Sequence, residues 1–205
     1  ICVLTIIGCC HLENLGDRNG VLKAKTEMFK FASEGAEFVL NGDDDKLATV
    51  TDVNGKKPIF FGLDSKNEYY AENIQNNADG GVLADICFGN TRLSVKIPAI
   101  GSYMVSNALA AVAVGKLCGL SDNELIKGVE SYKTVGSRAN VINTADYKII
   151  DDCYNANPTS VMASIDTLVN FKGRTVAILG DMKELGKNEL EMHYTTGEYA
   201  KEKGV

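Results

Sequence analysis

A histidine and a lysine near the N-terminus are the first residues whose side chains could take part in binding or catalysis. His11 follows the apolar run 1–7, and Lys25 comes fourteen residues later within a helical pattern. A neutral imidazole just past a buried strand can bind a metal ion, because open α/β sheets bind ligands at that end of their strands. The alternative, which spacing alone favours, is an exposed histidine and a solvated lysine, since charged side chains mostly face water.

A polar amide stands out in the segment 101–111, Gly-Ser-Tyr-Met-Val-Ser-Asn-Ala-Leu-Ala-Ala. Asn107 lies early in a predicted apolar helix, where its side chain can hydrogen-bond to a base edge or a ring nitrogen. The competing interpretation, favoured for Asn107 taken alone, is a hydrogen bond within the helix terminus.

A third group surrounds the end of a predicted strand. Its members are an arginine, an acid and three polar residues of one turn: Arg138, Asp152, Tyr154, Asn155 and Asn157. Arginine pairs with phosphate oxygens in a forked geometry, and a carboxylate accepts hydrogen bonds from ribose hydroxyls. Solvation of the strand end followed by a helix N-cap explains Asn157 and Pro158 equally well, but it leaves the other residues unexplained.

A fourth feature is the segment 178–186, Ile-Leu-Gly-Asp-Met-Lys-Glu-Leu-Gly, with His193 after it. The pattern of this segment predicts the end of a strand, a polar turn and the start of a helix. Its residue types alone indicate no function. His193 lies in a charged helical pattern, where a single histidine is expected to be solvated.

These groups need a sheet to position them, and the hydrophobic pattern predicts one. An apolar strand over 1–7, a helix from Gly20 to about Ala32 and a strand over 36–40 form a βαβ unit, which implies parallel pairing. The second strand ends before three consecutive aspartates. Four β-rich stretches then predict a small antiparallel layer attached to this core: 58–63, 69–74, 82–88 and 91–97.

A second composition shift falls near residue 136. Before it, Ser121 and Glu124 fit a capping box that starts a helix. After it, a second βαβ pattern is predicted by strands at 139–143 and 147–151, a helix from Pro158, a strand at 175–179 and a helix from about Lys187. We therefore expect an α/β protein of two domains, 1–136 with a parallel sheet and 137–205 with a Rossmann-like arrangement.

Composition narrows the class of protein. The chain has 205 residues, 45% of them hydrophobic, with a formal charge of −6 and no tryptophan. This excludes a disordered tail and disfavours nucleic-acid partners, which need a broad basic surface or stacking aromatics. No apolar run approaches the roughly 18 residues of a membrane span. The six cysteines form no C-x-x-C pair, so we expect reduced thiols in a cytoplasmic protein.

Four stretches together resemble the Mur ligases of peptidoglycan synthesis. They are His-Leu-Glu-Asn-Leu-Gly with Lys-Ala-Lys (11–16 and 23–25), Asn-Ala-Leu-Ala-Ala (107–111), Asp-Asp-Cys-Tyr-Asn-Ala-Asn-Pro (151–158) and Leu-Gly-Asp-Met-Lys-Glu-Leu-Gly (179–186). Their order and spacing agree along nearly the whole chain. The Tyr-Asn-Ala-Asn-Pro run most resembles the members that join D-alanyl-D-alanine to UDP-N-acetylmuramoyl-tripeptide.

The resemblance implies an ATP-dependent amide ligase. ATP phosphorylates the terminal carboxylate of the tripeptide, the amine of D-alanyl-D-alanine attacks the acyl phosphate, and phosphate leaves. By the same resemblance, His11 binds Mg²⁺, Lys25 becomes a carbamate that helps to hold it, and both act in catalysis with Arg138. The resemblance gives the nucleotide six contacts: Asn107 to adenine, Arg138 to phosphates, Asp152 to ribose, and Tyr154, Asn155 and Asn157 along the cleft.

The resemblance also implies a monomer that is a piece of a longer enzyme, with part of its central ATPase domain and part of its C-terminal domain. No G-x-x-x-x-G-K-[ST] phosphate loop occurs in the chain, so we expect no ligase activity from it alone. Cys9 and Cys10 beside His11 depart from the family pattern, as does the pair Tyr103-Met104. Two alternatives stay open: another Mur or folylpolyglutamate-type ligase, and a non-catalytic nucleotide-binding remnant.

Overall fold

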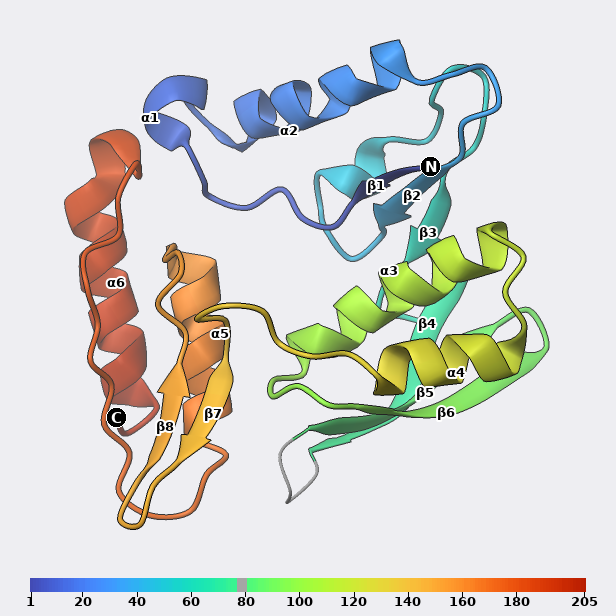
Figure 1. The fold of residues 1–205 in the computed structure, drawn as a ribbon. Helices are drawn as coiled ribbons and strands as arrows, with labels where there is room; N and C mark the ends of the chain where they lie inside the picture. The colour runs from blue at the N-terminus through green and yellow to red at the C-terminus, as the bar shows by residue number, and fades with distance from the viewer. Residues whose placement is uncertain (77–80) are drawn as a thin grey trace.

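The chain forms two parts with separate sheets in a computed structural model that describes residues 1–76 and 81–205 (Figure 1). The first part contains a six-stranded sheet in the sequential order β1-β2-β3-β4-β5-β6. The second part contains a two-stranded sheet, β7-β8, and two long helices. None of the described helices combines the length and apolar character needed to cross a lipid bilayer.

The six-stranded sheet changes from parallel to antiparallel along its width. Its strands are β1 (Cys2–Leu4), β2 (Phe38–Asn41), β3 (Ile59–Phe61), β4 (Tyr69–Asn76), β5 (Val82–Phe88) and β6 (Thr91–Ile97). Pairing is parallel from β1 to the start of β4 and antiparallel from β4 to β6. The predicted βαβ unit and its parallel sheet are confirmed.

Strand β3 corrects one prediction. The stretch 58–63 was expected in the antiparallel layer, but β3 pairs in parallel with β2, and the antiparallel strands continue the same sheet. Its segment Ile-Phe-Phe is apolar on both faces, as a strand inside a parallel sheet must be. Alternation with polar residues begins only further along, in β6.

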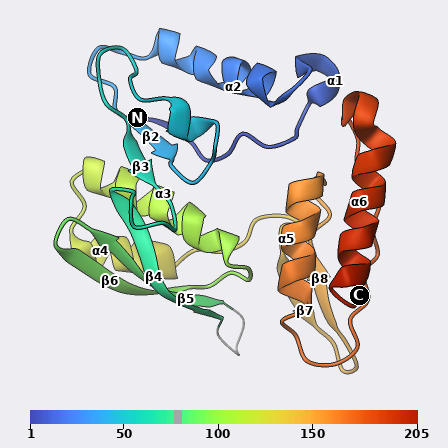
Figure 2. The same cartoon turned by 180° about the vertical axis from the view of Figure 1, so that it is seen from behind.

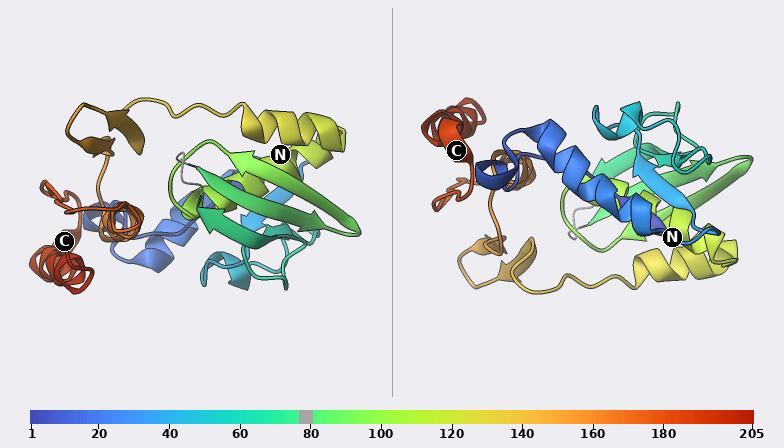
Figure 3. Two further views of the ribbon diagram at one scale, coloured as in Figure 1. Left: turned by 90° about the horizontal axis from the view of Figure 1, so that it is seen from below. Right: turned by 90° about the horizontal axis from the view of Figure 1, so that it is seen from above.

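Helices cover both faces of the sheet (Figure 3). They are α1 (Leu12–Leu15), α2 (Arg18–Thr26), α3 (Tyr103–Leu117) and α4 (Asp122–Glu130), with short 3₁₀ turns η1 (Glu27–Phe31) and η2 (Leu47–Thr49). Because successive strand side chains point to opposite faces, Val39 of β2 joins the core under α3, whereas Phe38 and Leu40 pack with Val21 of α2. The predicted capping box of Ser121 and Glu124 starts α4.

The second part is simpler than predicted. It contains β7 (Asn140–Asn143), β8 (Lys148–Asp151), α5 (Pro158–Leu168), the turn η3 (Gly186–Asn188) and α6 (Glu189–Glu202). The two strands predicted at 139–143 and 147–151 and the helix from Pro158 are confirmed, and the structure shows that β7 and β8 pair antiparallel as a hairpin.

The predicted strand over 175–179 is wrong, and with it the second βαβ unit. A strand needs a neighbour to accept and donate its backbone hydrogen bonds, and within the described ranges no strand pairs with this segment. Val176 and Ile178 instead leave 61% and 97% of their surface exposed. The apolar pattern is present, but among the described residues the segment forms no ladder with β7 or β8.

Asp85 on β5 links three strands and should make the fold sensitive to acid. Its carboxylate accepts hydrogen bonds from Ser94 Oγ (2.6 Å) and Asn73 Nδ2 (2.7 Å) and lies 3.4 Å from Arg92. These contacts, Ser94 first, lower the pKa of Asp85 below its model-peptide value of 3.8. Its contribution to stability is therefore present above pH 3.8 and is lost as the pH falls through the lowered pKa.

We expect Asp85→Asn to reduce the free energy of unfolding by about 1–2 kcal/mol at neutral pH, because hydrogen bonds to a charged group are weakened. Urea unfolding at pH 7 and at about pH 3 measures the change, which should shrink at the lower pH. Asp146→Asn, at an exposed loop position, is the matched control. An equal loss at both pH values would contradict this assignment.

Candidate functional site

A cleft of about 670 Å³ lies where the first part meets the second. One wall comes from the segment around α1 and the other from the segment around η3 and the start of α6, which lie side by side in Figures 1 and 2. The Glu184 carboxylate pairs with His11 Nδ1 across this boundary, and the Glu13 amide donates to the Glu184 carbonyl at 3.4 Å. The predicted metal ligand therefore faces the second part of the chain.

His11 and Lys25 both lie near the C-terminal end of β1. His11 is exposed and has a left-handed backbone (φ 55°) at the start of α1. Lys25 is half-buried on α2, and its Nζ donates to the Ile6 carbonyl at 2.7 Å. Lys25 thus turns back toward the strand end, but across the described ranges no hydrogen bond joins it to His11.

A buried acid that the sequence analysis did not single out supports this loop. Asp44 is 8% exposed, and its Oδ2 accepts a hydrogen bond from the Ile7 amide at 2.8 Å. Its Oδ1 accepts from the amides of Lys46 and Leu47 at 3.0 and 2.9 Å. The run of three aspartates after a strand was the signal in the sequence, but the identity of the buried one depends on the turn.

Arg18 completes the support from the opposite side. Its Nε donates to the Ile7 carbonyl at 2.7 Å, and its guanidinium forms a two-bond pair with Asp45. This pairing raises the pKa of Arg18 and lowers the pKa of Asp45. The segment that follows β1 is therefore held through both the amide and the carbonyl of Ile7.

Arg138, Asp152 and Tyr154 come together in the second part, as their spacing predicted. The guanidinium of Arg138 stacks on the Tyr154 ring, 4.1 Å from its centroid, and the Tyr154 amide donates to the Ser137 carbonyl. Asp152 Oδ1 accepts from the Ala139 amide at 3.0 Å, and Oδ2 accepts from Ser164 Oγ. A stacked guanidinium keeps its N–H edge free for an anion, and each Asp152 oxygen keeps one lone pair.

The remaining polar residues of this turn have local roles. Asn157 accepts a hydrogen bond from the Ser160 amide at 3.0 Å and forms the N-cap of α5, so its structural interpretation is observed. Asn155 is exposed, and its Oδ1 accepts from the Ala156 amide at 3.0 Å.

Asn107 lies in the second turn of α3 with its amide exposed. Its Nδ2 contacts Met104 Sδ at 3.4 Å, and thioether sulfur is a weak acceptor. The start of the same helix approaches the second part: burial raises the pKa of Tyr103, and the negative charge of Asp152 adds to this effect. The helix that carries Asn107 therefore begins beside Asp152.

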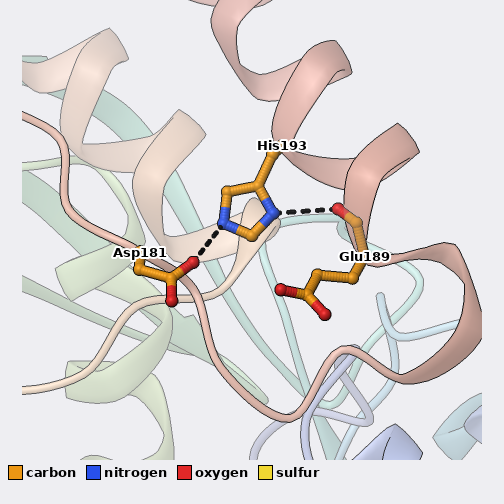
Figure 4. A group of neighbouring side chains, drawn as sticks. All are labelled: Asp181, Glu189 and His193. Carbon is orange, nitrogen blue, oxygen red and sulfur yellow. Dashed lines mark hydrogen bonds and ion pairs between the residues drawn. The ribbon is translucent and has the colours of Figure 1, made fainter.

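His193 is not simply solvated, which corrects the prediction for it. Its Nε2 accepts from the Met182 amide at 2.9 Å, and its Nδ1 lies 2.9 Å from the Glu189 carbonyl (Figure 4). Its side chain is 30% exposed. The ring therefore joins the turn 180–183 to the first turns of α6, which sequence periodicity alone did not indicate.

Comparisons with known proteins match both parts of the chain. Residues 1–115 match the family described as Mur ligase middle domain, and residues 137–205 match the one described as Mur ligase, glutamate ligase domain. The chain is 32% identical over 198 residues to the UDP-N-acetylmuramoyl-tripeptide–D-alanyl-D-alanine ligase of Bacillus subtilis. The match covers 95% of this chain and 42% of that protein.

Solved structures agree with the sequence comparison. A MurF crystal structure from Acinetobacter baumannii aligns with a TM-score of 0.91 at 28% identity, covering 98% of this chain and 44% of that one. The MurF ligase of Thermotoga maritima in complex with ADP aligns with a TM-score of 0.85 at 29% identity, over 97% and 45% of the two chains. The chain thus spans less than half the length of these relatives.

Proposed function

This chain belongs to the Mur ligase family, and from that membership we propose that it is part of an ATP-dependent ligase joining D-alanyl-D-alanine to UDP-N-acetylmuramoyl-tripeptide. The observation that carries the proposal is the cluster of Arg138, Asp152 and Tyr154 beside the start of α3. A free guanidinium edge and a carboxylate at a strand end suit the phosphates and ribose of a nucleotide. The names of the relatives support the choice of the two substrates.

The residues divide into a nucleotide group and a metal group. In the nucleotide group, Arg138 binds phosphate oxygens and Asp152 accepts hydrogen bonds from the ribose hydroxyls. The exposed amide of Asn107 hydrogen-bonds to the adenine. Tyr154 holds the guanidinium in plane. Asn155 contributes an exposed amide from the same turn. Asn157 contributes by fixing the start of α5, so its contact with nucleotide is the weakest of the assignments.

The donor set at the end of β1 fits Mg²⁺. His11 offers an exposed imidazole, and Lys25, whose half-buried side chain turns back to the Ile6 carbonyl, can supply oxygens as a carbamate. When bound, the ion supplies positive charge that offsets the charge developing during phosphoryl transfer. The chain itself orients these ligands, because Asp44 and Arg18 fix the strand end from which the His11 loop departs.

We also place the domain boundary near residue 136, with domains at 1–136 and 137–205. Separate sheets and separate family matches on either side support it. A cytoplasmic location is part of the same proposal, because the substrates are a nucleotide-linked precursor and a free dipeptide. We also propose that the protein is a monomer. The chain alone should not ligate, since its sequence contains no phosphate loop.

Other ligases of the same superfamily share this fold, and the relatives above favour the D-alanyl-D-alanine enzyme over them. A non-catalytic remnant is the other alternative, and nucleotide binding separates it from a retained half-site.

We expect calorimetric titration of the 205-residue chain with ADP to show binding, weakened about tenfold by Arg138→Ala because one charged phosphate contact is lost. Lys133→Ala, an exposed cation five residues earlier, is the matched control and should leave the affinity unchanged. A folded chain that binds no ADP would favour the remnant.

A further inference from the structure

The clearest feature that the proposed ligase function leaves unused is the surroundings of His193. Asp181 from the turn and Glu189 from the first turn of α6 flank its ring (Figure 4). One ligand atom from each of the three residues lies within 4.8 Å of the other two. Asp181 Oδ1 is 3.0 Å from His193 Nε2.

The hydrogen bonds of the ring determine which of its two nitrogens could bind a metal ion. Nδ1 lies 2.9 Å from the Glu189 carbonyl, which can only accept, so Nδ1 carries a proton. In the neutral ring Nε2 then presents a lone pair, and this lone pair faces the Asp181 carboxylate. Two acceptors 3.0 Å apart repel each other, and a cation beside them would offset this repulsion more strongly than the Met182 N–H that Nε2 already accepts.

We propose that Asp181, Glu189 and His193 bind a divalent cation of the Zn²⁺ class. Histidine ligands of metals commonly donate their other N–H to a backbone carbonyl, as His193 does. One nitrogen and two carboxylate oxygens, with water in the fourth position, form an ordinary zinc ligand set.

The spacing of the ligand atoms fits such an ion after a small adjustment. Metal–ligand bonds of about 2.0–2.1 Å in a tetrahedron place neighbouring ligand atoms about 3.3 Å apart. Asp181 and His193 are already close to this separation. Glu189 is exposed, so rotation of its side chain brings its carboxylate closer without disturbing the core.

The ion competes with one existing contact. The Met182 amide donates to Nε2 at 2.9 Å, and a metal on this nitrogen forces that N–H to find another acceptor. The site is therefore weaker than a closed structural zinc site. A bound ion would tie the turn 180–183 to α6 and reduce the negative charge of the cleft wall that Glu184 and Glu189 line.

The test uses ring-nitrogen NMR in a His11→Gln background, where His193 is the only histidine of the chain. Adding Zn²⁺ should shift the Nε2 resonance of His193 and leave Nδ1 protonated. The ring signal reports the histidine even if cysteine thiols also take up zinc. Asp181→Asn and Glu189→Gln should each weaken the effect about tenfold or more, because each removes a charged ligand.

Glu191→Gln is the matched control, since Glu191 is an exposed acid in the same first turn of α6 but is not in the cluster. It should leave the zinc response unchanged. The proposal is overturned if excess Zn²⁺ does not shift the Nε2 resonance, which would leave Nε2 accepting from the Met182 amide as before. It is also overturned if the shift persists in both ligand variants. Neither result bears on ADP binding, which involves other residues.

Discussion

Asp44→Ala is expected to lower the free energy of unfolding by about 3–5 kcal/mol, because it removes the acceptor of three backbone amides at once. Two of these bonds, to Ile7 and Leu47, are buried, so water cannot easily replace the carboxylate. Arg18 would also lose the charge that lies 3.7 Å from its guanidinium. Urea unfolding at neutral pH measures the change.

Asp45→Ala is the control for charge. Asp45 pairs with the same arginine, but its side chain is 65% exposed, so its removal should change the free energy of unfolding much less than removal of Asp44. Asp44→Asn, which keeps one acceptor oxygen, should fall between the two. Equal losses for Asp44→Ala and Asp45→Ala would mean that the amides of Ile7 and Leu47 find other acceptors and that the proposed support of the His11 loop is wrong.

Asp152→Ala is expected to have two separable effects. It removes the acceptor of the Ala139 amide and of Ser164 Oγ, which should lower the free energy of unfolding by about 2 kcal/mol. If Asp152 also accepts from the ribose, ADP affinity should fall about tenfold or more, since a charged acceptor is lost. Thermal or urea unfolding measures the first effect and calorimetric titration the second.

Asp152→Asn separates the two effects because it keeps an acceptor for the Ala139 amide and removes the charge. We expect it to recover most of the stability and little of the ADP affinity. Asp151→Asn, at the neighbouring position at the end of β8, is the matched control and should leave ADP binding unchanged. Normal ADP affinity in a folded Asp152→Asn variant would restrict Asp152 to a structural role.

Local signals predicted the elements that depend on neighbours in the chain. The capping box at Ser121, the N-cap at Asn157 and the apolar helix that carries Asn107 need only residues within a turn or two, and all three are observed. The parallel βαβ unit was also predictable, because a short crossover helix between two apolar strands permits few other arrangements. The strand over 175–179 failed for the opposite reason, since pairing partners lie outside any local pattern.

The same distinction between local and long-range contacts separates the site residues that were predicted from those that were missed. Arg138, Asp152 and Tyr154 lie on either side of one hairpin and were grouped correctly, since an antiparallel pair brings its ends together. Asp44 was missed because three adjacent aspartates look alike until the turn buries one of them. His193 was interpreted as solvated because its partner Met182 is eleven residues away across a turn.

The sequence by itself determined which residue types stand at strand ends, and the resemblance to Mur ligases that follows from their order. Both follow from the identity and spacing of residues along the chain. Only the tertiary structure decided that Glu184 faces His11, that Tyr103 lies beside Asp152, and that Asp181 approaches His193. These contacts join segments far apart in the chain or across a turn. Hydrophobic periodicity predicts which face of an element is buried, but it does not specify which polar side chains meet at its ends.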